Sequence, residues 1–306
     1  MTRRAFITGV SGFAGRHLAQ RLVSEGWSVA GTVRFRSADV PTVAEHRLKI
    51  DDVSGIGAVM AGFKPEVVYH LAAVVDTVTT PDVLALYRTN VIGTAAVLEA
   101  VASVSSVRRV LVASSAFVYG RTPPDLQPVP ETAALEPLTA YGASKVASEA
   151  IALQWSRATG VDVVVTRAFQ HTGPGHVGNY ALAEWAEQLA SGAPEISVGN
   201  LEVVRDYLDV RDVAAAYHCL AETGQAGGIY NVGSGEPVTM ASLLARLVEA
   251  FGGQARVEVD PTRFRVVDQP VFYADNRRLV ADTTWKPRFT IRESLQDLAD
   301  WWCLRS

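Results

Sequence analysis

Thr8-Gly9-Val10-Ser11-Gly12-Phe13-Ala14-Gly15 is the stretch that decides the fold, and it lies between a short apolar run and a helical pattern at 13–24. In its GxxGxxG spacing, Gly9 allows a tight turn, Gly12 lets the backbone approach a pyrophosphate, and Gly15 lets the helix pack closely on the sheet. The N-terminus of the helix offers free N–H groups and the positive end of its dipole to an anion. The order strand, glycine turn, helix therefore predicts a dinucleotide-binding unit.

The following residues extend this unit into an alternating pattern. Apolar runs predict strands at 5–8, 27–33, 48–50, 66–71, 107–113 and 161–166. Helical spacing is found at 13–24, 83–104 and 141–159. Strands that alternate with helices predict a parallel sheet covered on both faces, because each parallel connection needs a crossover.

After residue 169 the alternation ends. Helices are predicted at 180–190, 213–222, 240–251 and 291–302, with a short strand at 229–232. We therefore predict the α/β class, with a Rossmann-type doubly wound parallel sheet in residues 1–168 to which the second half also contributes. Residues 169–306 are expected to form mainly a smaller, interleaved α/β lobe.

The composition limits the class of protein. The chain has 306 residues, of which 48% are hydrophobic, and its 28 Lys+Arg against 32 Asp+Glu give a net charge of -4. This hydrophobic content excludes a disordered chain, and a mildly acidic balance without basic runs argues against a nucleic-acid surface. No stretch approaches the roughly 18 apolar residues of a membrane helix, and a strand begins at residue 5, before any secretory signal could fit. We expect a cytoplasmic protein.

The two cysteines indicate neither a disulfide framework nor a metal site. Cys219 and Cys303 both lie in apolar helical patterns, which predicts buried, inert thiols.

The end of the second strand indicates which dinucleotide would bind. An NAD site has an acidic residue there, which holds the ribose 2′-hydroxyl. From Gly31 to Ala38 this chain has no carboxylate, and has Arg34 and Arg36 instead. Two arginines can hold a 2′-phosphate through charge-assisted hydrogen bonds, so we predict NADP(H). The alternative is that both arginines are merely solvated.

Three polar residues form a candidate catalytic set. Ser115 ends the fifth strand, and Tyr141 and Lys145 are four residues apart, so they share a helix face. A tyrosine with its ordinary pKa near 10 is a poor acid at neutral pH, and a neighbouring ammonium is expected to lower that pKa. Ser115 could hydrogen-bond a carbonyl oxygen that Tyr141 protonates. A core tyrosine beside a surface lysine is the alternative, and the glycine turn upstream favours the catalytic interpretation.

Together these motifs resemble the extended short-chain dehydrogenase/reductases that act on nucleotide sugars. The resemblance covers nearly the whole chain, and its other motifs are His70-Leu71-Ala72-Ala73, Asn90-Val91-Ile92-Gly93-Thr94 and Ser115-Ala116-Phe117-Val118-Tyr119-Gly120. It implies that Ser115, Tyr141 and Lys145 are catalytic and that His70 is a packed strand residue. The cofactor would then be bound by Gly9, Ser11, Gly12, Phe13, Gly15, Arg34, Arg36, Asp51, Asp52, Leu71, Ala72, Ala73, Asn90, Tyr141 and Lys145.

The second half is most similar to GDP-6-deoxy-4-keto-mannose reductases, on the stretches 166–175, 198–212 and 284–287. This likeness implies that Arg205 and Arg265 grip the sugar diphosphate and that Asp268 holds ribose hydroxyls, although Arg205 could instead form a surface salt bridge. The implied substrate-binding residues are Ser115, Ala116, Phe117, Gln170, Arg205, Arg265 and Asp268. Gln170 replaces a common Asn, and 265–268 departs from the usual Arg-Pro-Ser-Glu, so the base, GDP or dTDP, and the sugar stay open.

The resemblance leaves several reactions to compare. Relatives that perform 4,6-dehydration use an acidic residue just after the catalytic Ser or Thr, where this chain has Ala116 and Phe117, and neither can move a proton. A 3,5-epimerase would need a further acid–base pair, often with a cysteine, and neither cysteine lies near the motifs. A 4-ketoreductase and a 4-epimerase need the same set. NADPH is the usual biosynthetic reductant, which favours the ketoreductase, with the 4-epimerase and a non-catalytic NADPH-binding protein as alternatives.

The resemblance also implies a homodimer that pairs through the helices at 83–104 and 141–159. The alternative is that these helices only cover the sheet.

Overall fold

The computed structural model describes residues 2–75, 82–264 and 269–305. Its centre is a seven-stranded sheet in which every pairing is parallel. The strand order is β10 (Ile229–Val232), β6 (Asp162–Ala168), β5 (Arg109–Ser115), β4 (Val67–His70), β1 (Arg4–Thr8), β2 (Ser28–Val33) and β3 (Ala44–Arg47). The chain winds outward from β1 in both directions, which confirms the doubly wound α/β fold.

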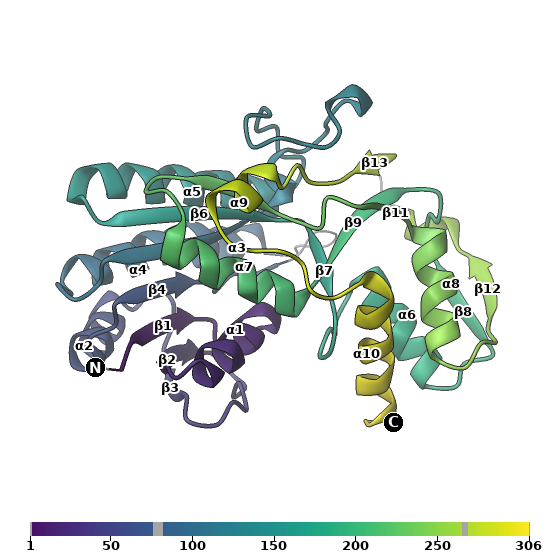
Figure 1. The fold of residues 1–306 in the computed structure, drawn as a ribbon, viewed down its shortest axis with the longest axis horizontal. Coiled ribbons are helices and arrows are strands. Elements are labelled where there is room, and N and C mark those ends of the chain that lie inside the picture. Colours follow the sequence, from purple (N-terminus) through teal and green to yellow (C-terminus); the bar gives the residue numbers. More distant parts are fainter. Residues whose placement is uncertain (1, 76–81, 265–268, 306) are drawn as a thin grey trace.

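Helices cover both faces of this sheet (Figure 1). One face carries α1 (Phe13–Ser24) and α7 (Val210–Thr223), and the other carries α2 (Val53–Phe63), α4 (Gly93–Ala102) and α5 (Ala140–Thr159). Successive residues of one strand enter different cores: Ile7 packs in the α1/α7 core and Phe6 in the α2/α4/α5 core, both fully buried. Burial on both faces explains the continuous apolar runs of the central strands.

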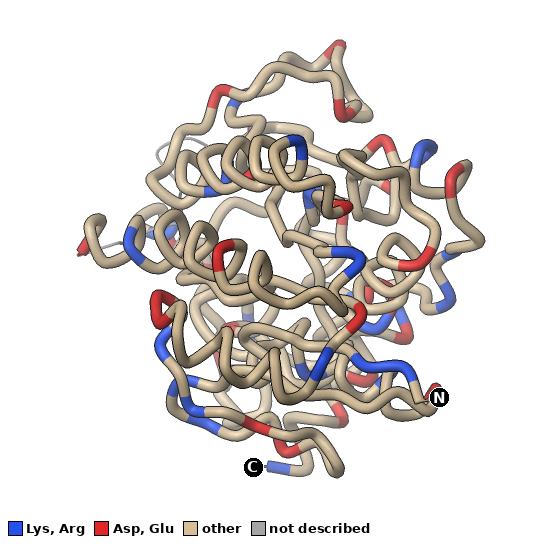
Figure 2. The backbone as a smooth tube through the Cα atoms, turned by 90° about the vertical axis from the view of Figure 1, so that its left-hand side faces the viewer, with Lys and Arg blue, Asp and Glu red and all other residues tan. Residues whose placement is uncertain are grey.

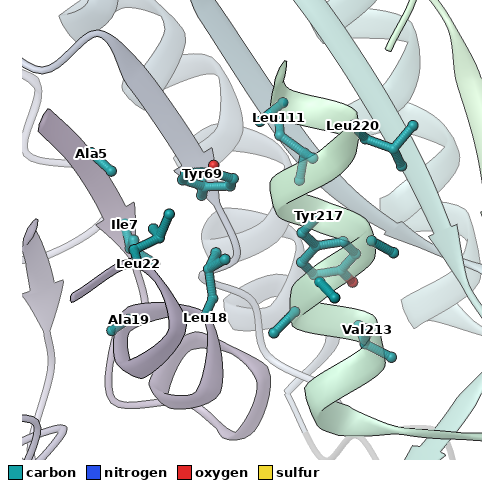
Figure 3. Packing of buried hydrophobic residues seen from close by; sticks show 14 of the residues in the cluster. Ala5, Ile7, Leu18, Ala19, Leu22, Tyr69, Leu111, Val213, Tyr217 and Leu220 are labelled. Carbon is teal, nitrogen blue, oxygen red and sulfur yellow. The ribbon is translucent and has the colours of Figure 1, made fainter. Parts of the chain in front are cut away.

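The α1/α7 core joins the two halves of the chain. Leu18 and Leu22 of α1 belong to the same buried core as Tyr217 and Leu220 of α7, together with residues of the sheet that both helices cover (Figure 3). Since α7 and β10 both come from the second half, the parallel sheet is completed by segments far away in sequence. The interleaving predicted from the sequence is therefore present.

Apart from α9 (Arg277–Asp282), which packs beside β10, most of the remaining second-half elements form the smaller lobe, at the right of Figure 1. In one small sheet β9 (Val204–Asp209) pairs with β11 (Pro237–Thr239), β13 (Val271–Phe272) and β7 (Gln170–Thr172). In another, β8 (Glu195–Val198) pairs with β12 (Arg256–Val259). The apolar faces of α6 (Ala181–Ala190), α8 (Met240–Ala250) and α10 (Ile291–Cys303) enclose a separate core.

The third strand lies earlier than predicted. It is 44–47, whose sequence Ala-Glu-His-Arg is polar because β3 is the exposed edge of the sheet. The predicted strand at 48–50 is wrong: Leu48 and Ile50 pack instead against the α2/α4/α5 core. The sequence analysis also missed α2, which follows directly.

Two other expectations need adjustment. The helical run from 83 is three consecutive pieces: α3 (Val83–Tyr87), a π-helical turn (Arg88–Ile92) and α4, which ends at Ala102. The prediction that both thiols are buried is wrong for Cys303, which is exposed at the last position of α10, and Cys219 is half-buried.

Charges are distributed without segregation in the view of Figure 2, where acidic and basic positions are interspersed over the backbone. Among the described residues, no helix has the length and apolar character needed to cross a membrane. Within the same ranges, no three His, Cys, Asp or Glu side chains gather as a candidate metal site.

Candidate active site

The glycine turn leaves no room for side chains. Gly9 has a φ of +71°, and a Cβ there would lie 2.9 Å from the Cα of Ala72. A Cβ on Gly15 would collide with the carbonyl oxygen of Gly9 and lie 3.1 Å from the Cα of Val10. The turn, the start of α1 and the segment after β4 are therefore in close contact, as the motif predicts.

The start of α1 has the properties of an anion site. Gly12 is the N-cap and has no side chain to satisfy the first N–H groups, and no acidic residue stands in the first turn. The hydrogen bond from the N–H of Arg16 to the carbonyl of Gly12 begins the helix, so the preceding amides are not used within it. These residues fit the pyrophosphate of a dinucleotide.

We expect Gly15→Ala to lower the free energy of unfolding by about 1–3 kcal/mol and to weaken NADPH binding, since backbone atoms block the new methyl group. Gly62→Ala is the matched control: it lies in α2, where a Cβ meets nothing within 4 Å, and should be neutral or stabilising. Denaturant unfolding and cofactor titration measure both effects. Equal behaviour of the two variants would contradict the close packing at Gly15.

Arg34 and Arg36 lie exposed just after β2, in the loop beside the glycine turn. The guanidinium of Arg34 lies over the ring of Phe35, 4.7 Å from its centre. The loop is fixed from β3 by Glu45, which accepts hydrogen bonds from Ser37 Oγ at 2.9 Å and Ala38 N at 2.7 Å. Both arginines are therefore available to an anion at this edge, and their contact with a 2′-phosphate stays a prediction.

The other predicted cofactor residues fall into two groups. Leu71, Ala72 and Ala73 follow β4 directly, and Ala72 touches the glycine turn as described. Asn90 instead uses its amide on the protein: Oδ1 accepts from Val74 N at 2.8 Å, and Nδ2 donates to Val74 O and Ser144 Oγ. Asn90 thus shapes the segment after β4.

The two aspartates before α2 are exposed. Asp52 caps α2 by accepting from Gly55 N at 2.9 Å, a structural use of its carboxylate that the sequence analysis did not foresee. Contact of Asp51 or Asp52 with the adenine stays a prediction.

The structure brings the predicted catalytic set together. Tyr141 is at the start of α5 and forms a side-chain hydrogen bond with Ser115 at the end of β5. Lys145 lies one turn later, with its Nζ 5.8 Å from the centre of the Tyr141 ring and 2.7 Å from the carbonyl oxygen of Ala113, to which it donates. All three side chains are buried. Burial excludes water, which strengthens every electrostatic interaction among them.

The pKa of Tyr141 is raised, because burial disfavours the phenolate, while the hydrogen bond with Ser115 acts in the opposite direction. The expectation that Lys145 lowers this pKa is therefore not met in this structure. Burial lowers the pKa of Lys145 itself to about 8, against the attraction of Glu149, which raises it. Tyr141 is thus a protonated phenol at neutral pH. The neighbouring Lys145 has a pKa only slightly above neutral pH.

His70 is a packed residue of β4. Its Nδ1 is 2.8 Å from Thr8 Oγ1 and its Nε2 2.9 Å from Thr94 Oγ1, and burial lowers its pKa to about 3. It is neutral at pH 7, and both ring nitrogens are engaged, as expected for a structural histidine.

Of the predicted substrate-binding residues outside the catalytic set, Phe117 is the one whose contact with Tyr141 the described residues show. Ala116 is buried, and the ring of Phe117 meets that of Tyr141 edge to face at 6.0 Å. Gln170, at the start of β7, has a buried Oε1 without a hydrogen-bond partner among the described residues, which fits a donor on a ligand. Arg205 is buried and donates to the carbonyls of Val204 and Gln269. Arg265 and Asp268 lie outside the described residues.

Sequence reasoning missed a buried ion pair behind this set. Glu149 of α5 pairs with Arg167 of β6 and accepts a hydrogen bond from Ser114 Oγ at 2.5 Å. The sequence contained a clue, because Tyr141, Lys145 and Glu149 follow one another at intervals of four on one helix.

The sequence analysis also did not predict a group of stacked aromatic rings beside the glycine turn. The ring of Phe13 stacks with those of His171 and His176, at centroid distances of 5.7 and 4.8 Å, and the ring of Tyr180 lies 5.2 Å from that of His176. The stack connects the turn to the loop that precedes α6. Nothing in the spacing of these residues indicates that they meet.

A doubly wound sheet, a glycine turn and a buried Ser–Tyr–Lys set define a nucleotide-cofactor oxidoreductase of the extended short-chain dehydrogenase/reductase class. The chain belongs to the NAD dependent epimerase/dehydratase family, whose model matches residues 5–233. This family acts on nucleotide sugars as oxidoreductases and epimerases and binds NAD(P).

Individual relatives agree with this assignment. The chain is 33% identical to the GDP-6-deoxy-D-mannose reductase of Pseudomonas aeruginosa over 98% of each chain. It is 30% identical to the UDP-glucose 4-epimerase of Mycolicibacterium smegmatis over 95% of this chain and 96% of that one. The structure of RMD from Pseudomonas aeruginosa in complex with NADPH superimposes with a TM-score of 0.87, at 32% identity over 100% of each chain.

Proposed function

We propose that this protein uses NADPH to reduce the C4 ketone of a nucleotide-linked 4-keto-6-deoxyhexose. The observation that carries the proposal is the convergence of Ser115, Tyr141 and Lys145 at the carboxyl end of the central strands. Arg34 and Arg36 support NADPH, and the likeness to a GDP-6-deoxy-D-mannose reductase supports a GDP-linked substrate, with dTDP as the alternative base.

The proton in this reaction comes from the chain's own residues. NADPH supplies the hydride for C4. Tyr141 donates its phenolic proton to the C4 oxygen, and its raised pKa keeps that proton present at neutral pH. Ser115 donates a hydrogen bond to the same oxygen and orients it. The Lys145 ammonium stabilises the phenolate that remains and would hold the nicotinamide ribose.

Neither Ala116 nor Phe117 can abstract a proton from C5, which argues against dehydration. A nucleotide-sugar 4-epimerase with a retained cofactor is the second candidate, favoured by the 30% identity to such an enzyme. Both reactions need the same three residues.

Incubation with NADPH and a panel of GDP- and dTDP-linked 4-keto sugars tests the proposal. Cofactor oxidation equal to the sugar consumed is expected. Sugar turnover without net oxidation would identify an epimerase, and cofactor binding without either would identify a non-catalytic protein. The base is tested by thermal shifts with GDP and dTDP, since the base that binds more tightly stabilises the fold more.

The pH dependence of kcat/KM should show an alkaline limb with a midpoint near pH 8. Lys145 must carry its proton to stabilise the Tyr141 phenolate, and its pKa is about 8, whereas that of Tyr141 is raised. The ammonium is present below this value and is lost as the pH rises through it, so reduction slows. Initial rates between about pH 6 and about pH 10 measure the limb, and a flat profile over that range would argue against this role of Lys145.

The double substitution Arg34→Ala, Arg36→Ala should raise the dissociation constant of NADPH about 10- to 100-fold and change that of NADH less than about twofold. The reason is that only NADPH carries the phosphate that the two guanidinium groups would bind. Arg292→Ala, which removes a surface arginine paired with Glu249, is the control for net charge. Equal losses for the two cofactors would show that the arginines do not bind the 2′-phosphate.

We further propose a cytoplasmic homodimer that pairs through the 83–104 and 141–159 helices. The exposed side chains of Leu84 and Ile92 in the first of these segments support such a contact. Sedimentation of the protein at micromolar concentration tests it, and a monomer mass would refute it.

A further inference from the structure

Successive turns on one face of α5 contact three consecutive residues at the end of β5. The first contact is the hydrogen bond of the Tyr141 side chain with Ser115. In the second Lys145 Nζ donates to a carbonyl oxygen at 2.7 Å, and in the third Glu149 accepts from a hydroxyl at 2.5 Å. The three pairs are Tyr141–Ser115, Lys145–Ala113 and Glu149–Ser114. The helix and the strand that carry the catalytic set are thus locked together by three adjoining contacts.

The third contact is anchored from another strand. Arg167 of β6 binds the carboxylate of Glu149 through two guanidinium nitrogens: Nε lies 3.0 Å from Oε1 and Nη2 lies 2.7 Å from Oε2. Arg167 Nη1 also donates to Tyr119 Oη at 3.1 Å and to the carbonyl of Glu131 at 2.9 Å. The side chains of the pair are only 3% and 4% exposed. Since bidentate pairs have a defined geometry, the carboxylate of Glu149 is fixed in place.

The carboxylate also lies beside the lysine, one helical turn away. Its attraction raises the pKa of Lys145 against the burial that lowers it. In the part of the chain that the structure describes, the other titratable groups that act on Lys145 or on Glu149 are Tyr141 on the same helix, His70 on β4 and, beyond Glu149, Arg167 on β6. Tyr141 and His70 are uncharged at neutral pH, because burial raises the pKa of the first and lowers that of the second.

We propose that Glu149 is a positioning residue of the active site. Glu149 is held in place by Arg167 and accepts a hydrogen bond from Ser114. In this way it positions the adjacent Ser115 next to Tyr141, and its charge keeps Lys145 in the ammonium form. The kinetic part of this inference rests on the proposed function, whereas the effect on Lys145 is a property of the fold.

The charge effect can be measured without turnover. The chain has four lysines, Lys49, Lys64, Lys145 and Lys286, so ¹³Cε-lysine labelling gives few NMR signals, and Lys145→Met assigns the one of interest. Glu149→Gln retains an acceptor for Ser114 but removes the charge, and should lower the titration midpoint of Lys145 by about one pH unit. Asp162→Asn is the control: it breaks the ion pair with Arg109 at the opposite end of β5 and β6, and should leave the midpoint unchanged.

A second variant separates this effect from misfolding. In Glu149→Gln, Arg167 loses its buried counter-charge, so Glu149→Gln with Arg167→Met removes both charges and should recover thermal stability. Both variants should show the lowered Lys145 midpoint. A shift from about 8 to about 7 reduces the ammonium fraction at pH 8 from about one half to about one tenth, and kcat should fall about fivefold there, with little change in the dissociation constant of NADPH.

Three outcomes would overturn the proposal: an unchanged Lys145 midpoint in both variants, an equal shift in Asp162→Asn, or a lowered midpoint with wild-type kcat at pH 8. Absence of turnover by the wild-type protein with the whole sugar panel would refute the proposed function instead. In that case the NMR titration would still decide whether Glu149 sustains the charge of Lys145.

Discussion

Tyr141→Phe should lower kcat about 10²- to 10⁴-fold while NADPH binds as before. The substitution removes the phenolic proton donor beside Ser115, and leaves the ring and its edge contact with Phe117 at 6.0 Å. Lys145 keeps its hydrogen bond to Ala113, so the residue that we propose to hold the nicotinamide ribose stays in position. Loss of NADPH absorbance in single turnovers measures the chemical step, and fluorescence titration measures binding.

Tyr69→Phe is the matched control for losing a buried tyrosine hydroxyl. Tyr69 is fully buried on β4, and its Oη lies 3.3 Å from His218 Nδ1, on the side of the sheet where α1 and α7 pack. It should lower stability slightly and leave kcat unchanged. Near-wild-type turnover in Tyr141→Phe, or an equal loss in Tyr69→Phe, would remove Tyr141 from the mechanism.

Ser115, Tyr141 and Lys145 could be selected as candidates from the sequence because the patterns that mark them are local. Tyr141 and Lys145 are linked by helical periodicity, and Ser115 by the end of an apolar strand, so no long-range knowledge is needed. Likewise Gly9 and Gly15 identify a turn within eight residues. The parallel sheet follows from the same reasoning, since alternating strands and helices have few arrangements.

Other features could not be predicted because they depend on distant partners. Glu149 continues the period of four, but only the fold brings Arg167 to it from a strand, and a lone acidic residue on a helix is usually solvated. Similarly, Arg205 is held by the carbonyl of Gln269, 64 positions away. The position of the edge strand β3 was not predicted for another reason. This strand has a single neighbour, so its sequence needs no apolar pattern.

The largest effect on stability is expected from Arg167→Met, which should lower the free energy of unfolding by about 3–5 kcal/mol. The Arg167 side chain is 3% exposed, and its removal leaves the carboxylate of Glu149 buried, with the Ser114 hydroxyl as its one remaining donor among the described residues. Tyr119 and the carbonyl of Glu131 each lose a donor as well. Urea unfolding at pH 7 measures the loss, and Arg292→Met, whose ion pair with Glu249 is exposed, should cost less than about 1 kcal/mol.

The origin of this loss can be separated from mere loss of packing by a double-mutant cycle. If an unpaired buried charge is the cause, Arg167→Met combined with Glu149→Leu should be more stable than Arg167→Met alone, because the second substitution removes that charge. Additive losses would mean that the pair acts only by filling space, and that its charges are not coupled.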